Sequence, residues 1–283
     1  MLAPADANGP VILIIPGSGP TDRNGNNPLG LKAASYRLLA EGLAAEGITS
    51  VRVDKRGMFG SAKAITDGNA ITIADYAADV HAWIAKIREA KKAPCVWVAG
   101  HSEGGLVALA TAQGQTADIC GLVLIAAPGR SLGEILRAQF KSNPANAPIL
   151  ADAMTILDAL EAGRKIDVSK FHPVLQQMFY PGVQGFLIDE YSYDPAKLIA
   201  SYAGPVLILQ GERDIQIDVA DARLLKAADD RAKLVLLPDT NHVLKTVTSD
   251  DRHANVATYG DPSLPLAPGV VDAVAGFVTG ATH

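Results

Sequence analysis

Three residues that together can cleave an acyl bond each follow an apolar run. Ser102 comes after the run CVWVA, Asp214 after PVLILQ and His242 after KLVLLP. A serine hydroxyl is a weak nucleophile until a base takes its proton, and a histidine base needs a carboxylate to fix its tautomer. These residue types predict a serine nucleophile, an orienting acid and a general base.

The stretch VAGHSEGGL around Ser102 passes directly from an expected strand into an expected helix over Leu106–Ala112. So sharp a turn strains the backbone of its middle residue and needs small neighbours, here Gly100 and Gly104. A Gly-x-Ser-x-Gly pattern alone is more often an ordinary turn. The strand before it and the helix after it favour an exposed nucleophile.

Other residues compete for the two partner roles. Glu212 lies two residues before Asp214, and Glu134 lies soon after the preceding strand. We favour Asp214 because it comes in a GxxD setting just past a strand.

Two other histidines compete with His242. His253 lies in the polar run SDDRHAN and is expected at the surface, whereas His172 is expected in an inserted segment. His101, beside the serine, is expected to point elsewhere and pack. We therefore assign the base to His242.

Strands are expected at Val11–Ile15, Thr49–Val53, Cys95–Ala99, Leu122–Ala126, Pro205–Gln210 and Lys233–Leu237. They are continuously apolar and alternate with segments of helical spacing, as in an α/β fold whose parallel sheet is covered by helices on both faces. In such a sheet the loops at the carboxyl ends of the strands share one edge. The three candidate residues are expected to meet there.

The strand–helix rhythm breaks between residues 130 and 203. Helical pieces are expected there at Leu132–Phe140, Ala151–Ala162 and Val174–Phe179, separated by prolines. A segment this long is not a simple loop. We interpret residues 1–283 as a single domain with a helical cap inserted at 130–203, whose aromatic residues Phe186, Tyr191 and Tyr193 are candidates to line an acyl pocket.

The order Ser102, Asp214, His242 along the chain resembles that of the α/β-hydrolase superfamily. The resemblance covers nearly the whole chain and implies a nucleophile, an orienting acid and a general base in that order. In the family's count of strands, the insert follows the sixth strand.

A narrower resemblance is carried by IIPGSGPTDRNGNNPLG, which is similar to a loop in bacterial serine carboxylesterases with a PGSGPxDRDGN motif. Asn24 replaces an aspartate of that pattern. The family's loop implies one backbone N–H of an oxyanion hole, by position that of Ser18 with Gly19 in reserve, and the residue after the nucleophile, Glu103, implies the other. Asp22 and Arg23 are expected to form a local ion pair that holds this loop.

Family members usually begin with an antiparallel hairpin, and here only about ten residues precede the strand at Val11. We expect the hairpin to be short or missing, either because an amino-terminal segment has been removed or because the edge strand is covered in another way. An uncovered edge strand invites pairing with another chain, so a homodimer is an expectation.

The composition restricts partners and compartment. Of 283 residues 48% are hydrophobic and 19% charged, and the net charge of −5 offers no basic face for nucleic acid. The apolar runs are too short to cross a bilayer, and the first residues, MLAPADANGP, lack the features of a signal peptide. We expect a cytoplasmic protein as written, or a periplasmic or secreted one if a leader has been removed.

Cys95 and Cys120 each lie near the start of an expected strand. Buried free thiols are the expectation, with a disulfide as the alternative if the two strands are neighbours.

We expect an enzyme, a carboxylesterase acting on small, short-chain acyl esters, with no cofactor and no metal. A thioesterase, a peptidase or another acyl hydrolase would use the same three residues. The alternative from a different class is a catalytically silent binding protein of the same fold.

Overall fold

The computed structural model describes residues 1–4, 9–65 and 67–280. Its centre is a parallel sheet in the order β2-β1-β3-β4-β5-β6. The strands are β1 (Val11–Ile15), β2 (Thr49–Arg52), β3 (Val96–His101), β4 (Ile119–Ile125), β5 (Val206–Gly211) and β6 (Lys233–Leu237). All six expected strands are present. β3 runs two residues further than expected because Gly100 and His101 still pair with β4.

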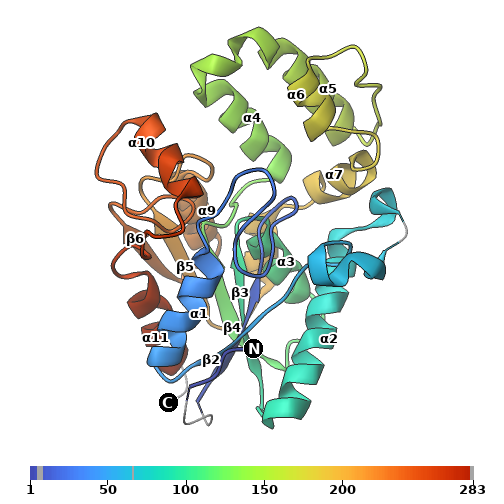
Figure 1. Cartoon of the computed structure of the whole chain (residues 1–283). Coiled ribbons are helices and arrows are strands. Elements are labelled where there is room, and N and C mark those ends of the chain that lie inside the picture. Colours follow the sequence, from blue (N-terminus) through green and yellow to red (C-terminus); the bar gives the residue numbers. More distant parts are fainter. Residues whose placement is uncertain (5–8, 66, 281–283) are drawn as a thin grey trace.

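Helices cover both faces of the sheet (Figure 1). On one face lie α1 (Ser35–Ala45) and α11 (Val270–Gly280), and on the other lie α2 (Ile73–Lys91), α3 (Glu103–Thr111) and α9 (Val219–Ala228). Alternate residues of each strand enter the two cores, as Leu13 and Ile14 do in β1. With both faces buried, the strands have no polar side, which explains their continuously apolar sequences.

Between β4 and β5 the chain forms α4 (Leu132–Ser142), α5 (Leu150–Glu161), α6 (Pro173–Met178), α7 (Gln184–Tyr191) and α8 (Pro195–Ser201). We call residues 130–203 the insert. In Figure 1, α4, α5 and α6 stand together at the top of the view, apart from the sheet. The insert has an apolar core of its own, built around residues such as Ile156, Leu160 and Phe179. The sequence did not indicate α7 or α8.

Short elements complete the connections. They are the 3₁₀ helices η1 (Phe59–Ala64), η2 (Gly68–Ala70), η3 (Pro144–Ile149) and η4 (Thr258–Gly260), and the helix α10 (Arg252–Ala257). No helix among the described residues is long and apolar enough to cross a membrane.

Cys95 and Cys120 form a disulfide. The expectation of free thiols was wrong, and the alternative holds because β3 and β4 are neighbours with Val96 opposite Ile119. The bond closes a loop over a sequence separation of 25 residues.

The edge of the sheet at β2 is partly covered by the chain itself. Leu2 makes an antiparallel bridge to Ser50, with its N–H donating to the Ser50 carbonyl at 2.9 Å and its carbonyl accepting from the Ser50 N–H at 2.8 Å. The described residues before β1 thus contribute a single antiparallel bridge at this edge.

Candidate active site

Ser102 lies in the turn between β3 and α3, at the carboxyl edge of the sheet. Its backbone has φ 54° and ψ −125°, a strained conformation for a residue with a side chain. The glycines around it are required by space, because a Cβ on Gly100 would lie 2.0 Å from the Gly104 carbonyl oxygen. The tight turn places Ser102 directly before the amino end of α3, where the helix dipole is positive.

Asp214 and His242 come from the loops after β5 and β6. His242 Nδ1–H donates to Asp214 Oδ2 over 2.8 Å, and the Asp214 side chain is 1% exposed. The other oxygen of Asp214, Oδ1, accepts from the backbone N–H groups of Gln216 at 2.7 Å and Ile217 at 3.0 Å. These bonds fix the carboxylate, which in turn fixes the imidazole ring.

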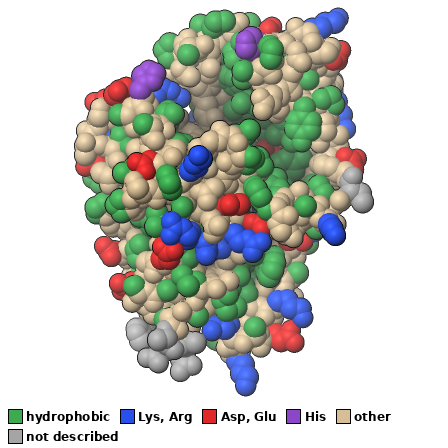
Figure 2. Space-filling view, in the orientation of Figure 1, with side chains coloured by type: hydrophobic (Ala, Val, Ile, Leu, Met, Phe, Trp, Pro, Cys, Tyr) green, Lys and Arg blue, Asp and Glu red, His purple; other side chains and the backbone are tan. Residues whose placement is uncertain are grey.

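Ser102 and His242 line the same cavity, whose volume is about 550 Å³. Its walls come from the loop between β1 and α1 and from the segment that forms α10 and η4. The other lining residues are Gly17, Ser18, Thr21, Asn27, Leu29, Gly30, Leu31, Tyr36, His101, Gln216, Val243, Val256, Ala257, Tyr259 and Gly260. In the space-filling view the surface is hollowed between the insert and the region of α10 (Figure 2).

The expected oxyanion residues lie on either side of Ser102. Ser18 lines the cavity, and a Cβ on the neighbouring Gly17 would lie 3.2 Å from the Ser102 Cβ. Glu103 is the first residue of α3, where backbone N–H groups have no partner within the helix. Gly19, the reserve, has φ 65° and is not among the described residues that line the cavity.

A chain of hydrogen bonds, centred on His101 and Tyr36, joins the three loops of the site. The Gly17 N–H donates to Tyr36 Oη at 3.0 Å, and the Tyr36 hydroxyl donates to His101 Nδ1 at 2.8 Å. His101 Nε2–H then donates to the His242 carbonyl at 2.8 Å. Burial lowers the pKa of His101 to about 3, so the ring is neutral and has one donor and one acceptor nitrogen for this chain.

The expected ion pair between Asp22 and Arg23 is absent, because each side chain has another partner. Arg23 pairs with Asp54, which follows β2, whereas Asp22 Oδ1 accepts from the backbone N–H groups of Asn24 and Asn26. Asn24 Oδ1, at the position where the motif has an aspartate, accepts from Arg52. The loop is thus held to the neighbouring strand.

The competing candidates lie elsewhere. His172 caps the amino end of α6 and His253 lies in α10, both exposed. Glu134 caps α4 together with Ser131. Glu212 is exposed, whereas its neighbour Asp214 is bonded to His242.

The aromatic residues of the insert are not in the cavity wall. Phe186 and Tyr193 pack on the core beside α2, and Tyr191 is buried within the insert. None of the three is among the described residues that line the cavity beside Ser102. The expectation that they line an acyl pocket therefore has no support for that cavity.

Three further polar residues, Tyr36, Lys55 and Glu190, are buried close to the site, and no sequence motif pointed to them. The only signal was a lysine two residues after the strand expected at Thr49–Val53, because lysine is almost never fully buried unless it is paired. The tyrosine and the glutamate occur in ordinary helical sequence and gave no signal.

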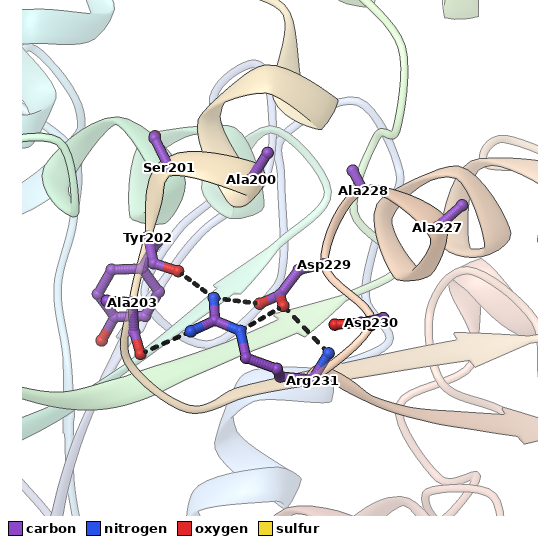
Figure 3. Close-up of a pocket in the computed structure, with 9 residues that line it drawn as sticks. All are labelled: Ala200, Ser201, Tyr202, Ala203, Ala227, Ala228, Asp229, Asp230 and Arg231. Carbon is purple, nitrogen blue, oxygen red and sulfur yellow. Dashed lines mark hydrogen bonds and ion pairs between the residues drawn. The ribbon is translucent and has the colours of Figure 1, made fainter.

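A second cavity of about 510 Å³ lies at the opposite edge of the sheet, before β5 and β6. Figure 3 shows the Arg231 guanidinium placed between Asp229 and the carbonyl groups of Tyr202 and Ala203. Its nitrogens donate to an Asp229 oxygen at 2.9 Å, to the Tyr202 carbonyl at 2.7 Å and to the Ala203 carbonyl at 3.2 Å. The charged side chain thus joins two loops, and we assign this cavity a structural role.

Comparison with known proteins agrees with this architecture. The model of the alpha/beta hydrolase family matches residues 12–258. No curated protein matches the sequence.

Solved structures of hydrolases share the fold. A thermophilic esterase from Thermogutta terrifontis is similar with a TM-score of 0.59 and 18% identity over 97% of this chain and 91% of that one. Est1E from Butyrivibrio proteoclasticus has a TM-score of 0.58 and 15% identity over 99% and 92%. The enol-lactonase from Burkholderia xenovorans has a TM-score of 0.55 and 21% identity over 98% and 94%. The expected fold, a mostly parallel sheet flanked by helices, is confirmed.

Proposed function

The chain belongs to the alpha/beta hydrolase family, and from this premise we propose that it is a serine hydrolase that cleaves small, short-chain carboxylic esters through an acyl-enzyme on Ser102. One observation carries the proposal: a serine held in a strained turn shares a cavity with a histidine that is bonded to a buried aspartate. Backbone strain of this kind persists mainly at functional sites.

In the proposed reaction the Ser102 hydroxyl attacks the ester carbonyl. Because Nδ1 of His242 carries the proton bonded to Asp214, its Nε2 is free to take the serine proton and then to give it to the leaving alcohol. Water next attacks the acyl-enzyme, again with His242 as the base, and releases the acid. The N–H groups of Ser18 and Glu103 are the proposed donors to the oxyanion.

The cavity supports a neutral substrate. Apart from two histidines, its described lining residues carry no Asp, Glu, Lys or Arg side chain, and Leu29, Leu31 and Val256 give it apolar surface. A charged acyl group would lose its hydration there without gaining a partner. We therefore expect p-nitrophenyl butyrate to be hydrolysed with a kcat/KM at least roughly tenfold above that of the p-nitrophenyl hemisuccinate, which has the same chain length. Equal values would contradict the neutral-substrate assignment.

We further propose that the insert, residues 130–203, acts as a cap. Gln139 of α4 donates through Nε2 to the Gln216 carbonyl at 2.9 Å. The N–H of Gln216 is one of the two backbone groups that donate to the Asp214 carboxylate. The insert is thus in contact with the loop that carries the orienting acid.

The test is covalent labelling with a fluorophosphonate, followed by hydrolysis of activated esters. Wild type is expected to label on Ser102, and Ser102→Ala is expected to lose labelling and at least roughly three orders of magnitude in kcat. Ser169→Ala, at an exposed serine of the insert, is the matched control and is expected to behave as wild type.

A wild type that neither labels nor hydrolyses esters would point to the binding-protein alternative. If it labels, a panel of esters, thioesters and amides of matched acyl length separates the carboxylesterase from the thioesterase and the peptidase. The esterases and the enol-lactonase of the same fold favour the ester, because a lactone is a cyclic ester.

A further inference from the structure

Three ionisable side chains from three separate segments are buried together behind the oxyanion loop. Lys55 follows β2, Glu103 is the first residue of α3 and Glu190 lies in α7 of the insert; their residues are 6%, 1% and 4% exposed. Lys55 Nζ donates to Glu103 Oε1 over 2.5 Å and to the Gly17 carbonyl over 2.8 Å. The proposed reaction scheme uses none of these side chains.

The bond from Lys55 to Gly17 fixes the orientation of one peptide group. In a trans peptide the C=O and the following N–H point in opposite directions. A Gly17 carbonyl that faces Lys55 therefore directs the Ser18 N–H away from the lysine. The peptide before it is also held, because the Gly17 N–H donates to Tyr36. Among the described residues, no protein group accepts a hydrogen bond from the Ser18 N–H.

We propose that Lys55 is a positioning residue that holds the Gly17–Ser18 peptide so that the Ser18 N–H faces the oxyanion, and that Glu190 couples this arrangement to the insert. The inference rests on the proposed function, since it assigns a task within that reaction. Lys55 itself is behind the loop and does not touch the substrate.

Glu190 provides the coupling because it is buried beside Glu103, and its Oε1 atom has no hydrogen-bond partner among the described residues. Burial, as the larger cause, and the neighbouring Glu103 raise the pKa of Glu190 well above its usual range. The other groups that face it are Lys55, Asp189, Tyr76 and Tyr191. A neutral Glu190 leaves one carboxylate, that of Glu103, to balance one ammonium, that of Lys55.

Glu190, in α7 of the insert, thus helps to shield the Lys55–Glu103 pair from solvent. If the insert moved away, this pair would be exposed to water, and its hold on the Gly17 carbonyl would weaken.

The first experiment compares wild type with the double variant Lys55→Met/Glu103→Gln. Removing both charges together avoids leaving either one buried and unpaired. We expect the kcat of the folded double variant for p-nitrophenyl butyrate to fall roughly 10- to 100-fold, and its KM to change by less than roughly threefold. The decrease in kcat should be smaller than that caused by removing an oxyanion donor altogether, because the Ser18 N–H is still present. The Ki of a trifluoromethyl ketone, whose adduct has an oxyanion, should rise by the same factor as kcat falls.

The matched control is Lys86→Met/Glu89→Gln, which removes an exposed ion pair from α2. It is expected to leave kcat, KM and Ki unchanged. A folded Lys55→Met/Glu103→Gln protein with kcat and Ki within twofold of wild type would overturn the positioning role.

The second experiment tests the coupling through Glu190. It keeps Lys55 and Glu103 in place, so it can be carried out even if the double variant does not fold. Glu190→Ala, which leaves Lys55 in place, is expected to lower kcat roughly three- to tenfold, and Glu190→Gln, which keeps a neutral donor, is expected to restore it. Equal kcat for wild type and Glu190→Ala would overturn the coupling.

The two levels of inference fail in different ways. If wild type is not labelled at Ser102, the proposed function fails and the positioning role with it. If wild type is labelled and active but the variants keep its kcat, only the inference about Lys55 and Glu190 fails.

Discussion

At the scale of single residues, His101 links the nucleophile turn to the loop of the proposed base. Both of its ring nitrogens are engaged, one with Tyr36 and one with the His242 carbonyl, and its ring centre is 4.7 Å from that of His242. A protonated His101 would have to give up the bond that it accepts from the Tyr36 hydroxyl. The neutral ring is therefore a condition for the geometry of the site.

This condition predicts a loss of stability in acid. Burial is the main cause that lowers the pKa of His101 from 6.5 to about 3. Between these two pH values the unfolded chain binds a proton at His101 and the folded protein does not. The free energy of unfolding is therefore highest above about pH 6.5 and decreases as the pH falls toward 3. We expect His101→Gln, which cannot be protonated, to lose less stability than wild type over this range. Urea denaturation at several pH values measures the difference, and parallel curves for the two proteins would contradict the prediction.

At the scale of elements, the contact between the end of β1 and the start of α3 leaves no space for a side chain. A Cβ on Gly104 would lie 2.5 Å from the Ile15 carbonyl oxygen and 2.7 Å from that of Pro16. Both sides of this contact are backbone, so neither can move without shifting the loop after β1, which carries the proposed oxyanion donor Ser18, or the turn of Ser102. The glycine thus keeps the two parts of the proposed site in register.

We expect Gly104→Ala to lower the free energy of unfolding by about 1–3 kcal/mol and to reduce kcat, because relief of the clash must displace one of these two segments. The matched control is Gly276→Ala in α11, where a Cβ would meet nothing within 4 Å. Alanine there should stabilise the helix by up to about 1 kcal/mol and leave kcat unchanged. Thermal and urea unfolding measure the stability of the two variants, and ester hydrolysis measures their kcat. A Gly104→Ala protein as stable and active as wild type would contradict the prediction.

At the scale of the whole molecule, the disulfide Cys95–Cys120 joins the two central strands just where they begin. It lies at the edge opposite the proposed site and so affects stability without touching the reaction. A disulfide of this kind persists only under oxidising conditions.

We expect Cys95→Ser/Cys120→Ser to lower the free energy of unfolding by roughly 3 kcal/mol, the loop-closure contribution for a separation of this size, with kcat within twofold of wild type. A reductant should destabilise wild type by a similar amount and leave the double variant unchanged, which provides the control. If the reductant had no effect on wild type, the assigned bond would be in doubt.

The sequence predicted the features that depend on one segment at a time. The strands could be predicted because each is a continuous apolar run, and the positions of Ser102, Asp214 and His242 at one edge of the sheet because each follows such a run. Features that depend on two distant segments could not be predicted. Arg23 pairs with Asp54 instead of Asp22 because β1 and β2 are neighbours. The cluster of Lys55, Glu103 and Glu190 likewise exists only once the end of β2, the start of α3 and α7 of the insert come together.

The bridge from Leu2 to Ser50 has a consequence for self-association. The outward N–H and C=O groups of Ser50 already have partners in the same chain. A second copy that tried to extend the sheet at this strand would first have to peel Leu2 away and match the bonds it replaced. Pairing of two copies through this edge strand is therefore disfavoured, and so is open-ended association in which one sheet extends the next.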